Sequence, residues 1–399
     1  MANNEIERIL SDFWELGFLP TKPREGQILV AHQMVSVVAG VRRGGKSTRV
    51  LQHAEELIAN GKLPSIRNVV WIDFDNPILA TLKADELHLI ERAVQRLNPS
   101  FEIHTPLLFI FDEIHKIEGW ENYVIQLSRN PYRKVVVTGS SSKLLQGDIA
   151  TELRGKSITT HMYPLSFSEF LGFNDIPPGS SSKAVADITR CFDQYLRWGA
   201  FPALYHIIDA FKPQLLREYF DTMMLRDVIQ RYNISKPAQC TKLLTYYYSN
   251  MAKPHTLKAS YEYIKSTGMP TSRDALRSYT EIAEDSSMLY SIPIFSNSLK
   301  DRERNYSKIY PVDWGLAQHT SPVWYGYLSR ALETIVFIEL KRRGFCVNYY
   351  LTRKDRKEID FVVSKQGQVI ALIQVSMNTS NQKTFDREIA PPHSHCQIF

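Results

Sequence analysis

The stretch GVRRGGKST, residues 40–48, combines glycines, a lysine and a hydroxyl residue at the spacing GxxxxGK[ST]. Glycine-rich backbone can curl its N–H groups around a phosphate, and a helix that starts there adds positive potential. We therefore expect Lys46 to reach the β- and γ-phosphates of a nucleotide and Ser47 to ligate Mg²⁺. Arg42 and Arg43 either touch phosphate or are solvated. The residues predicted to contact the nucleotide are Gly40, Arg42, Arg43, Gly44, Gly45, Lys46, Ser47 and Thr48.

An acidic pair ends the apolar run of TPLLFIFDE, residues 105–113. Asp112 at the end of this run would hold Mg²⁺ through water, and Glu113 would orient and polarise an attacking water molecule. The alternative is a strand that ends in a solvated acidic turn. Because the glycine-rich loop supplies the complementary half of a phosphate site, we interpret the pair as the catalytic part of a nucleotide-hydrolysing site.

Both motifs need a particular framework of strands and helices. The β-branched run at 35–39 predicts a buried strand before the loop, and apolar residues at helical spacing predict a helix over 47–60. Further strands are predicted at 68–74, 106–111, 134–138 and 158–162, with helical patterns between them. This alternation predicts an α/β fold with a parallel sheet covered by helices on both faces, and ligands bind at the carboxyl ends of such strands.

Two more side chains are candidates for the same chemistry. In the polar run TGSSS, residues 138–142, Ser140 either senses the γ-phosphate or simply caps a helix. Arg154 lies between the fourth and fifth predicted strands. It would stabilise transition-state charge on a neighbouring subunit's nucleotide, or it forms a surface salt bridge.

Four segments together resemble a family of prokaryotic AAA+ ATPases with C-terminal winged-helix and nuclease-like domains. They are GVRRGGKST, LLFIFDEIHKIEGWE, VVVTGSSSKLLQGDIATELRGK and YPLSFSEF. The resemblance covers nearly the whole chain. It implies a P-loop sheet of the AAA+ type, Mg·ATP as ligand, and a fold that permits oligomers. The implied domains are an ATPase core (1–176), a helical lid (184–235), a winged helix (236–320) and a degenerate PD-(D/E)XK nuclease-like domain (325–399).

The segment LRWGAFPAL, residues 196–204, is similar to a Gly-x-x-Pro segment that packs near adenine in this family. Gly199 and Pro202 occupy the matching positions. The alternative is a turn that ends a helix. Further on, Arg226 and Asp227 either pair across domains or with nucleotide, or form a solvated pair.

Residues 237–317 read as three helices followed by two strands, which is the winged-helix pattern. We expect the third helix to be capped by Thr271 or Ser272. In DNA-binding members of this class the third helix enters the major groove and the hairpin loop touches backbone. The basic residues offered are Arg273 and Arg277 on the helix and Lys300, Arg302 and Arg304 on the loop. Double-stranded DNA and an unidentified protein are both expected partners.

The C-terminal region reads as a helix over 328–344 and three strands, which resembles the PD-(D/E)XK nuclease core. Asp360 takes the first acidic position and Glu333 is an auxiliary candidate. The Glu-x-Lys position instead reads Gln374-Val375-Ser376. Since serine cannot replace the lysine, we predict an inactive nuclease fold, with an active Mg²⁺-dependent nuclease as the alternative. The ending APPHSHCQIF departs from the expected helix and strand, which we interpret as a truncation or frame shift.

Composition sets the remaining limits. The 399 residues carry 48 Lys and Arg against 42 Asp and Glu, a formal excess of +6, which by itself identifies no partner. The four cysteines lie far apart, which disfavours a zinc site or a disulfide framework. No apolar run approaches the roughly 20 residues of a membrane span, and the acidic start does not resemble a signal peptide. We expect a cytoplasmic protein that makes no membrane contact.

Overall fold

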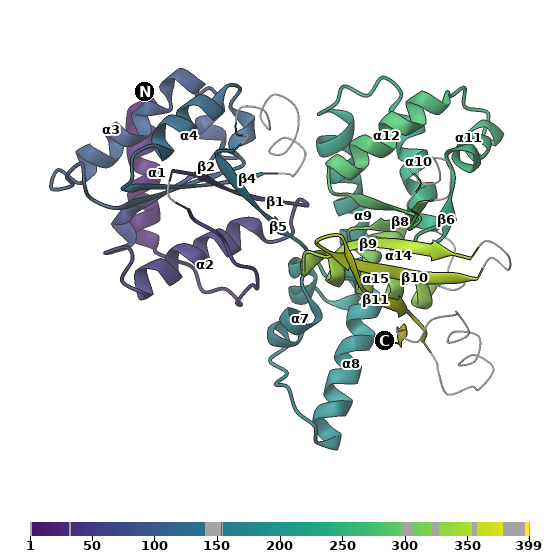
Figure 1. Cartoon of the computed structure of the whole chain (residues 1–399). Coiled ribbons are helices and arrows are strands. Elements are labelled where there is room, and N and C mark those ends of the chain that lie inside the picture. Colours follow the sequence, from purple (N-terminus) through teal and green to yellow (C-terminus); the bar gives the residue numbers. More distant parts are fainter. Residues whose placement is uncertain are drawn as a thin grey trace. The chain divides into compact units, whose positions relative to one another are not determined.

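The computed structural model describes residues 2–31, 33–139, 153, 155–296, 298, 307–320, 327–352, 357–377 and 396–398. The chain forms two compact units, Met1–Met162 and Tyr163–Phe399 (Figure 1). Among the described residues, no helix has the length and apolar character needed to cross a membrane. The limits predicted for the four domains stay predictions.

A five-stranded parallel sheet forms the centre of the first unit, in the order β2-β3-β4-β1-β5. Its strands are β1 (Val35–Gly40), β2 (Val69–Asp73), β3 (Leu107–Asp112), β4 (Arg133–Gly139) and β5 (Ser157–Met162). Strands β1 and β3 are buried along their whole length. This burial explains their continuous apolar runs, because a parallel sheet is covered on both faces. The predicted α/β class and parallel sheet are confirmed.

Four helices surround this sheet: α1 (Ala2–Leu16), α2 (Lys46–Ala59), α3 (His88–Leu97) and α4 (Trp120–Ser128). Helix α2 lies on one side of the sheet, and α3 and α4 lie on the other (Figure 1). Helix α1 packs on α3 and β2, where the indole N–H of Trp14 donates to the carbonyl of Val69 at 2.9 Å. The sheet core and these helices share one continuous apolar cluster.

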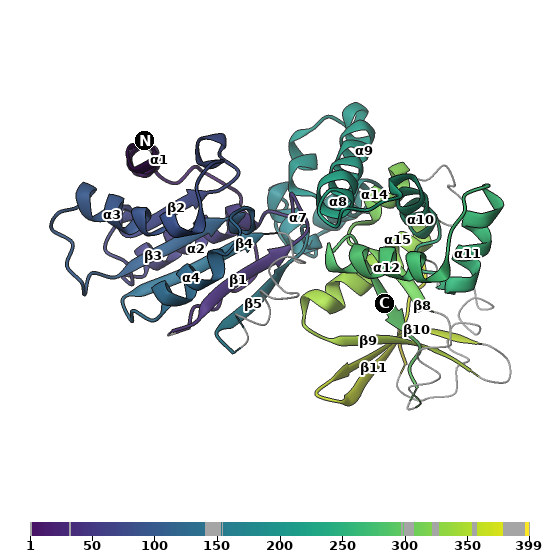
Figure 2. The ribbon, with the colours of Figure 1, turned by 90° about the horizontal axis from the view of Figure 1, so that it is seen from above.

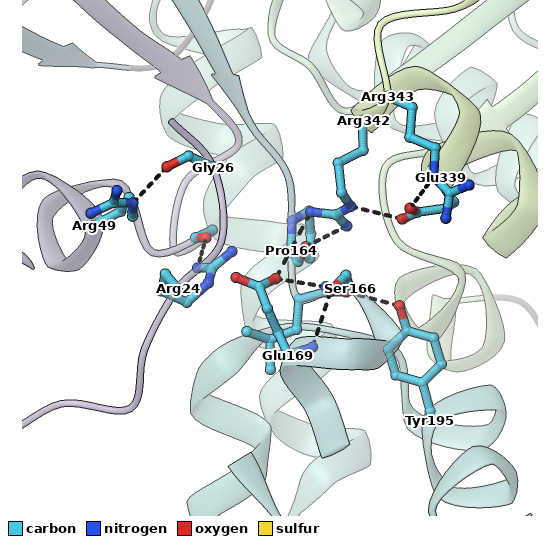
Figure 3. Close-up of polar contacts among 12 residues, drawn as sticks. Arg24, Gly26, Arg49, Pro164, Ser166, Glu169, Tyr195, Glu339, Arg342 and Arg343 are labelled. Carbon is cyan, nitrogen blue, oxygen red and sulfur yellow. Dashed lines mark hydrogen bonds and ion pairs between the residues drawn. The ribbon is translucent and has the colours of Figure 1, made fainter. Parts of the chain in front are cut away.

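The second unit begins with α7 (Phe167–Phe173), α8 (Ser182–Trp198) and α9 (Lys212–Met223). The segment YPLSFSEF supplies the start of α7. Ser166 is the N-cap and accepts from the Glu169 N–H at 3.0 Å, while the Glu169 carboxylate accepts from the Ser166 N–H at 2.7 Å. The guanidinium of Arg342 donates to the Pro164 carbonyl at 2.9 Å beside this capping box (Figure 3). The stretch therefore has a structural function at a helix start.

Helix α9 continues into a π-helix, Met224–Ile229. The wider turn is visible in its hydrogen bonds, since the Gln230 N–H donates to the Leu225 carbonyl at 2.8 Å. The Asp227 carbonyl accepts from the hydroxyl of Ser286 at 2.9 Å. Asp227 is buried and Arg226 is exposed, and the pairings considered from the sequence stay predictions.

The next elements are α10 (Pro237–Ser249), β6 (Pro254–His255), α11 (Leu257–Ser266), α12 (Arg273–Asp285), β7 (Leu289–Pro293), β8 (Ser307–Pro311) and α14 (Trp314–Thr320). The strands form an antiparallel sheet in the order β6-β8-β7. Ser272 caps α12 by accepting from the Ala275 N–H at 3.1 Å. The three expected helices and two expected strands are thus present, and the loop residues Lys300, Arg302 and Arg304 lie outside the described residues.

The C-terminal elements are α15 (Tyr327–Arg342), β9 (Cys346–Leu351), β10 (Glu358–Lys365), β11 (Gln368–Gln374) and β12 (Cys396–Ile398). The strands form a sheet in the order β12-β11-β10-β9, and α15 packs on β9 and β10 (Figure 2). An aromatic stack joins this part to β8, because the rings of Tyr310 and Phe337 lie 4.3 Å apart and Phe361 packs beside them. The two small sheets of this unit therefore share one core.

Candidate functional site

The loop between β1 and α2 holds two residues in left-handed backbone conformations. Gly45, the N-cap of α2, has φ of 89°, and Arg43 has φ of 63°. Glycine takes this conformation without strain, whereas for arginine the left-handed conformation costs about 1–2 kcal/mol of conformational free energy. The Gly44 N–H donates to the Val41 carbonyl at 3.2 Å. No side chain caps α2, so the N–H groups of its first turn are suited to an anion.

Strand packing also restricts the residue type at position 40, independently of the phosphate-binding motif. A Cβ at this position would lie 2.1 Å from the carbonyl oxygen of Met162, its register partner on β5. Only glycine lets β1 and β5 approach this closely. Gly40 is therefore required by sheet packing, whatever it contributes to phosphate binding.

Lys46 is buried and its ammonium group lies inside the loop. It donates to the carbonyl oxygens of Gly40 and Val41, both at 3.2 Å. Its Nζ also lies 3.8 Å from Oε1 of Glu113. The loop and the acidic pair, which are far apart in the sequence, are thus brought together as predicted for a phosphate site.

Asp112 ends β3 within hydrogen-bonding reach of two hydroxyl groups. One belongs to Ser47 and the other to Thr138 at the end of β4. Burial raises the pKa of Asp112, and these hydrogen bonds oppose that shift. A Ser hydroxyl beside an Asp carboxylate is a pair of hard oxygen ligands of the kind that Mg²⁺ prefers, so the residues present fit this ion.

Glu113 follows in a left-handed conformation with φ of 52°. Its N–H donates to the Thr138 hydroxyl oxygen at 3.3 Å, and its Oε2 lies 3.3 Å from Nδ1 of His115. A left-handed glutamate costs free energy that the surroundings must offset, and such residues cluster at functional sites. The carboxylate is thereby held between Lys46 and His115.

A further carboxylate lies at the same edge of the sheet. Asp73 ends β2 in register with Asp112, and burial raises the pKa of Asp73, with the carboxylates of Asp75 and Glu113 adding to the effect. Among the described residues no group of three or more His, Cys, Asp and Glu side chains is arranged to hold a metal ion by itself. Any Mg²⁺ here would depend on Ser47, Asp112 and the nucleotide.

An arginine from the segment before β1 contacts the loop from outside. Arg24 is buried, and its Nη1 donates to the carbonyl oxygen of Gly44 at 2.6 Å. Its backbone N–H donates to the Gln52 side chain at 3.0 Å. Close by, Arg49 of α2 donates to the Gly26 carbonyl at 2.7 Å (Figure 3). Nothing in the sequence pattern predicted a role for Arg24.

A cavity of about 490 Å³ adjoins the start of α2. Its wall includes Phe13 of α1, Trp71 of β2 and Leu51 of α2, and Ser47 and Thr48 contribute to the side nearest the loop. Thr48 is half-buried. Thr48 therefore borders both the loop and this cavity.

The remaining candidates are placed elsewhere. Ser140 and Arg154 lie outside the described residues. Gly199 ends α8 with φ of 88°, and a Cβ there would lie 2.2 Å from Oδ1 of Asp313. Pro202 opens the 3₁₀ helix Pro202–His206. Close packing on Asp313 requires glycine at position 199, and the predicted place of both residues near adenine stays a prediction.

Asp313 is a fully buried carboxylate at the start of α14. It accepts from the N–H groups of Ala200 at 2.6 Å and Gly315 at 2.8 Å. Burial nevertheless raises its pKa to about 7. The role of this residue is structural, and the sequence analysis did not identify it.

A buried lysine lies beside Asp360 and Glu333, although the sequence analysis found no lysine at the Glu-x-Lys position. Lys308 on β8 is fully buried. Its Nζ lies 2.7 Å from Oε1 of Glu333 and 3.3 Å from Oδ1 of Asp360, and it also pairs with Glu358. The three carboxylates raise the pKa of Lys308 against the effect of burial, and burial raises the pKa of Glu333 to about 7. The ammonium group occupies the middle of the acidic cluster.

Gln374 and Ser376 take no lysine-like role. The Asp360 N–H donates to the Gln374 side-chain oxygen at 3.3 Å, and the Val375 N–H donates to Oδ2 of Asp360 at 2.9 Å. The cation near Asp360 therefore comes from β8, about fifty residues earlier in the chain.

Family models match three successive parts of the chain. Residues 32–171 match an AAA domain. This AAA domain contains the loop, the acidic pair and Thr138. Residues 189–323 match a domain of unknown function (DUF8612), and residues 328–393 match another (DUF4143).

Two relatives align with most of the chain. "Uncharacterized protein MJ1544" of Methanocaldococcus jannaschii is 29% identical over 374 residues, which is 92% of this chain and 79% of that protein. An "uncharacterized protein" of Haemophilus influenzae is 28% identical over 336 residues, which is 84% of this chain and 81% of that protein.

Solved structures show a looser likeness. The Walker-type ATPase PABY2304 of Pyrococcus abyssi aligns with 80% of this chain and 95% of its own, with a TM-score of 0.46 and 11% identity. The ORC1 protein of Aeropyrum pernix, solved in complex with DNA, aligns with 80% of this chain and 91% of its own, with a TM-score of 0.27 and 9% identity. These TM-scores are low and carry no argument about the fold. The α/β fold of the first unit is read from its own five-stranded sheet, and its similarity to AAA domains from the family match.

Proposed function

We propose that the protein binds Mg·ATP at the loop of residues 40–48 and hydrolyses it to ADP and phosphate. The observation that carries this proposal is the meeting of Lys46, Ser47, Asp112 and Glu113 at the carboxyl ends of β1 and β3. The AAA-domain match over residues 32–171 supports it.

Each residue has a role that follows from its position. The ammonium group of Lys46, now held by two backbone carbonyls, would exchange them for phosphate oxygens, which carry more negative charge. Ser47 and Asp112 would hold Mg²⁺, which neutralises phosphate charge when bound. Gly45 and the first turn of α2 would donate N–H groups to the β-phosphate.

Glu113 would accept a proton from the attacking water or orient it. His115 and Lys46 hold the two carboxylate oxygens of Glu113, one each. Thr138 keeps Asp112 and Glu113 in register, because its hydroxyl donates to the first and accepts from the backbone N–H of the second. Ser140 as a γ-phosphate sensor and Arg154 as a residue acting on a neighbouring subunit's nucleotide remain parts of this proposal.

The direct test is steady-state ATP hydrolysis by the wild type, Glu113→Gln and Lys46→Ala. Loss of a general base reduces turnover about 10²–10⁴-fold, so Glu113→Gln should bind ATP and turn it over very slowly. Lys46→Ala should lose nucleotide affinity. Unchanged turnover in Glu113→Gln would remove Glu113 from the mechanism, and unchanged affinity in Lys46→Ala would refute the proposal.

We further propose that nucleotide state is transmitted to the lid (184–235), winged-helix (236–320) and nuclease-like (325–399) regions. In the family this sequence resembles, Gly199 and Pro202 would lie near adenine, which would provide the link. Hydrogen exchange of these regions with and without ATP, in Glu113→Gln to prevent turnover, measures it. Identical exchange in both states would leave the ATPase uncoupled from them.

A second candidate function is a slowly hydrolysing switch that binds duplex DNA. The observation that favours it is the pair Arg273 and Arg277, one turn apart and both exposed on α12. The guanidinium of Arg273 also lies 5.6 Å from the ring centre of Tyr261, which orients it. A recognition helix presents basic residues in this way.

DNA affinity as a function of salt tests this candidate. Replacing Arg273 and Arg277 by alanine should weaken binding and lower the salt slope by about 2. Arg190→Ala on α8 is the matched control, since Arg190 is an exposed arginine on another helix. Equal losses in both variants would indicate nonspecific charge, and stimulation of turnover by DNA would favour a DNA-coupled ATPase.

The geometry around Lys308 disfavours nuclease activity. A metal ion for phosphodiester hydrolysis would need the carboxylates of Glu333 and Asp360, which already surround a buried ammonium group. Mg²⁺-dependent nicking of plasmid DNA that is lost in Asp360→Ala would overturn this interpretation.

A further inference from the structure

The peptide between Gly44 and Gly45 has no side chain of its own to fix its orientation. Glycine populates both signs of φ, so a peptide between two glycines can rotate at little cost. In a trans peptide the carbonyl and the following N–H point in opposite directions. Whatever fixes the Gly44 carbonyl therefore also fixes the direction of the Gly45 N–H.

Arg24 is the side chain in that position. Its Nη1 donates to the Gly44 carbonyl at 2.6 Å, and the residue is only 6% exposed. A buried hydrogen bond from a charged donor is stronger and shorter than one between neutral groups. The contact comes from outside the loop, so the Gly45 N–H is directed to the opposite side.

The segment that carries Arg24 is itself anchored. The Gln52 side chain donates to the Thr21 hydroxyl and to the Lys22 carbonyl, both at 2.8 Å, and accepts from the Arg24 N–H at 3.0 Å. One turn earlier on α2, Arg49 donates to the Gly26 carbonyl at 2.7 Å. The backbone on both sides of Arg24 is thus tied to the helix that starts at the loop.

We propose that Arg24 is a positioning residue for nucleotide binding, which locks the Gly44–Gly45 peptide so that its N–H faces the phosphate. This rests on the proposed ATP site. Its cationic group lies behind the loop and contacts no phosphate; it acts through the backbone. The loop is then preorganised before ATP arrives, which avoids an ordering cost on binding.

Arg24→Met removes the donor but keeps a long apolar side chain. The expected result is a rise of about tenfold in Kd and KM for ATP, the size of one hydrogen bond to a charged group, with kcat nearly unchanged. KM changes and kcat does not, because the bound phosphate uses the same N–H in the ground state and in the transition state. Arg24→Lys keeps a charged donor and should recover most of the affinity.

Gln52→Met and Arg49→Met are the matched controls. They loosen the same segment without removing a contact to the loop, so their effect on ATP affinity should be much smaller at equal loss of thermal stability. If Gln52→Met raises KM as much as Arg24→Met, the arginine only anchors the segment and the inference fails. It also fails if Arg24→Met binds ATP like the wild type, or if Arg24→Lys shows no recovery. Wild-type protein that binds no ATP would refute the proposed function instead.

Discussion

Replacement of Lys308 by methionine removes an ammonium group that pairs with three neighbouring carboxylates. The Nζ of Lys308 contacts Glu333 at 2.7 Å and Asp360 at 3.3 Å, and pairs with Glu358 as well. Methionine has a similar length and fills the same space. The change in unfolding free energy therefore reports the loss of the positive charge and not a change in side-chain volume.

The expected loss is large because the partners stay buried. Removing one member of a buried ion pair costs about 3–5 kcal/mol of unfolding free energy, whereas a surface pair such as that of the exposed Arg190 with Asp187 contributes at most about 1 kcal/mol. Without the ammonium group, the pKa values of Glu333 and Asp360, already raised, should rise further. A carboxyl group with a raised folded-state pKa stabilises the fold at low pH and loses that contribution as pH rises through the raised value.

The deficit of Lys308→Met should therefore be greatest near pH 9 and shrink by about 1.4 kcal/mol per pH unit for each carboxyl group that becomes protonated. Urea denaturation followed by far-UV circular dichroism gives the free energy. Hydrogen exchange of peptides from β8, β10 and α15 locates the loss. Lys308→Met combined with Glu333→Gln should restore part of the stability, and Arg190→Met is the surface control. A variant as stable as the wild type, or one whose deficit is the same at about pH 6 and about pH 9, would refute this reasoning.

Three other substitutions have equally definite outcomes. Asp313 has a folded-state pKa raised to about 7, so its ionisation lowers the unfolding free energy of the wild type as pH rises from about 4 to about 7. Asp313→Asn should remove about 1.4 kcal/mol per pH unit of this decline. Denaturant titrations across that pH range measure the slope, and an unchanged slope contradicts the raised pKa. Gly199→Ala should cost at least about 1–3 kcal/mol from its backbone conformation alone, besides the clash with Asp313; a wild-type melting temperature would be incompatible with the close approach. Thr138→Val should lower kcat at constant ATP affinity, because Asp112 and Glu113 lose their shared hydroxyl, and turnover equal to Thr138→Ser would contradict this.

The sequence was most informative where local pattern and burial agree. Continuous apolar runs predicted β1 and β3 because strands of a parallel sheet are covered on both faces. The loop motif and the acidic pair together predicted that Ser47 and Asp112 would lie close together, since the carboxyl ends of parallel strands lie at one edge. Thr138 was within the polar run that the sequence singled out, but its position beside Asp112 depends on strand register.

The sequence was least informative where function depends on contacts between distant segments. Arg24 reaches Gly44 across a loop without periodicity, and Lys308 meets Asp360 through the packing of two small sheets. Comparison of Gln374 and Ser376 with a motif could detect a missing lysine but could not locate its substitute. For Gly199 the sequence offered an adenine-packing segment or a turn that ends a helix, and the close approach to Asp313 is visible only in the structure.

The π-helix at Met224–Ile229 has a consequence for insertions and deletions. A π-turn holds one more residue than an α-turn, so deleting one residue here would restore regular α-helix and keep the backbone hydrogen bonds of the helix itself. The residues after the deletion would keep about the same orientation around the helix axis, because the wider turn absorbs the extra residue. The Asp227 carbonyl would then accept a backbone hydrogen bond within the helix, and the hydroxyl of Ser286, which follows α12, would lose its acceptor. The extra residue therefore leaves the Asp227 carbonyl available to Ser286, and a single-residue deletion would remove this contact without unfolding α9.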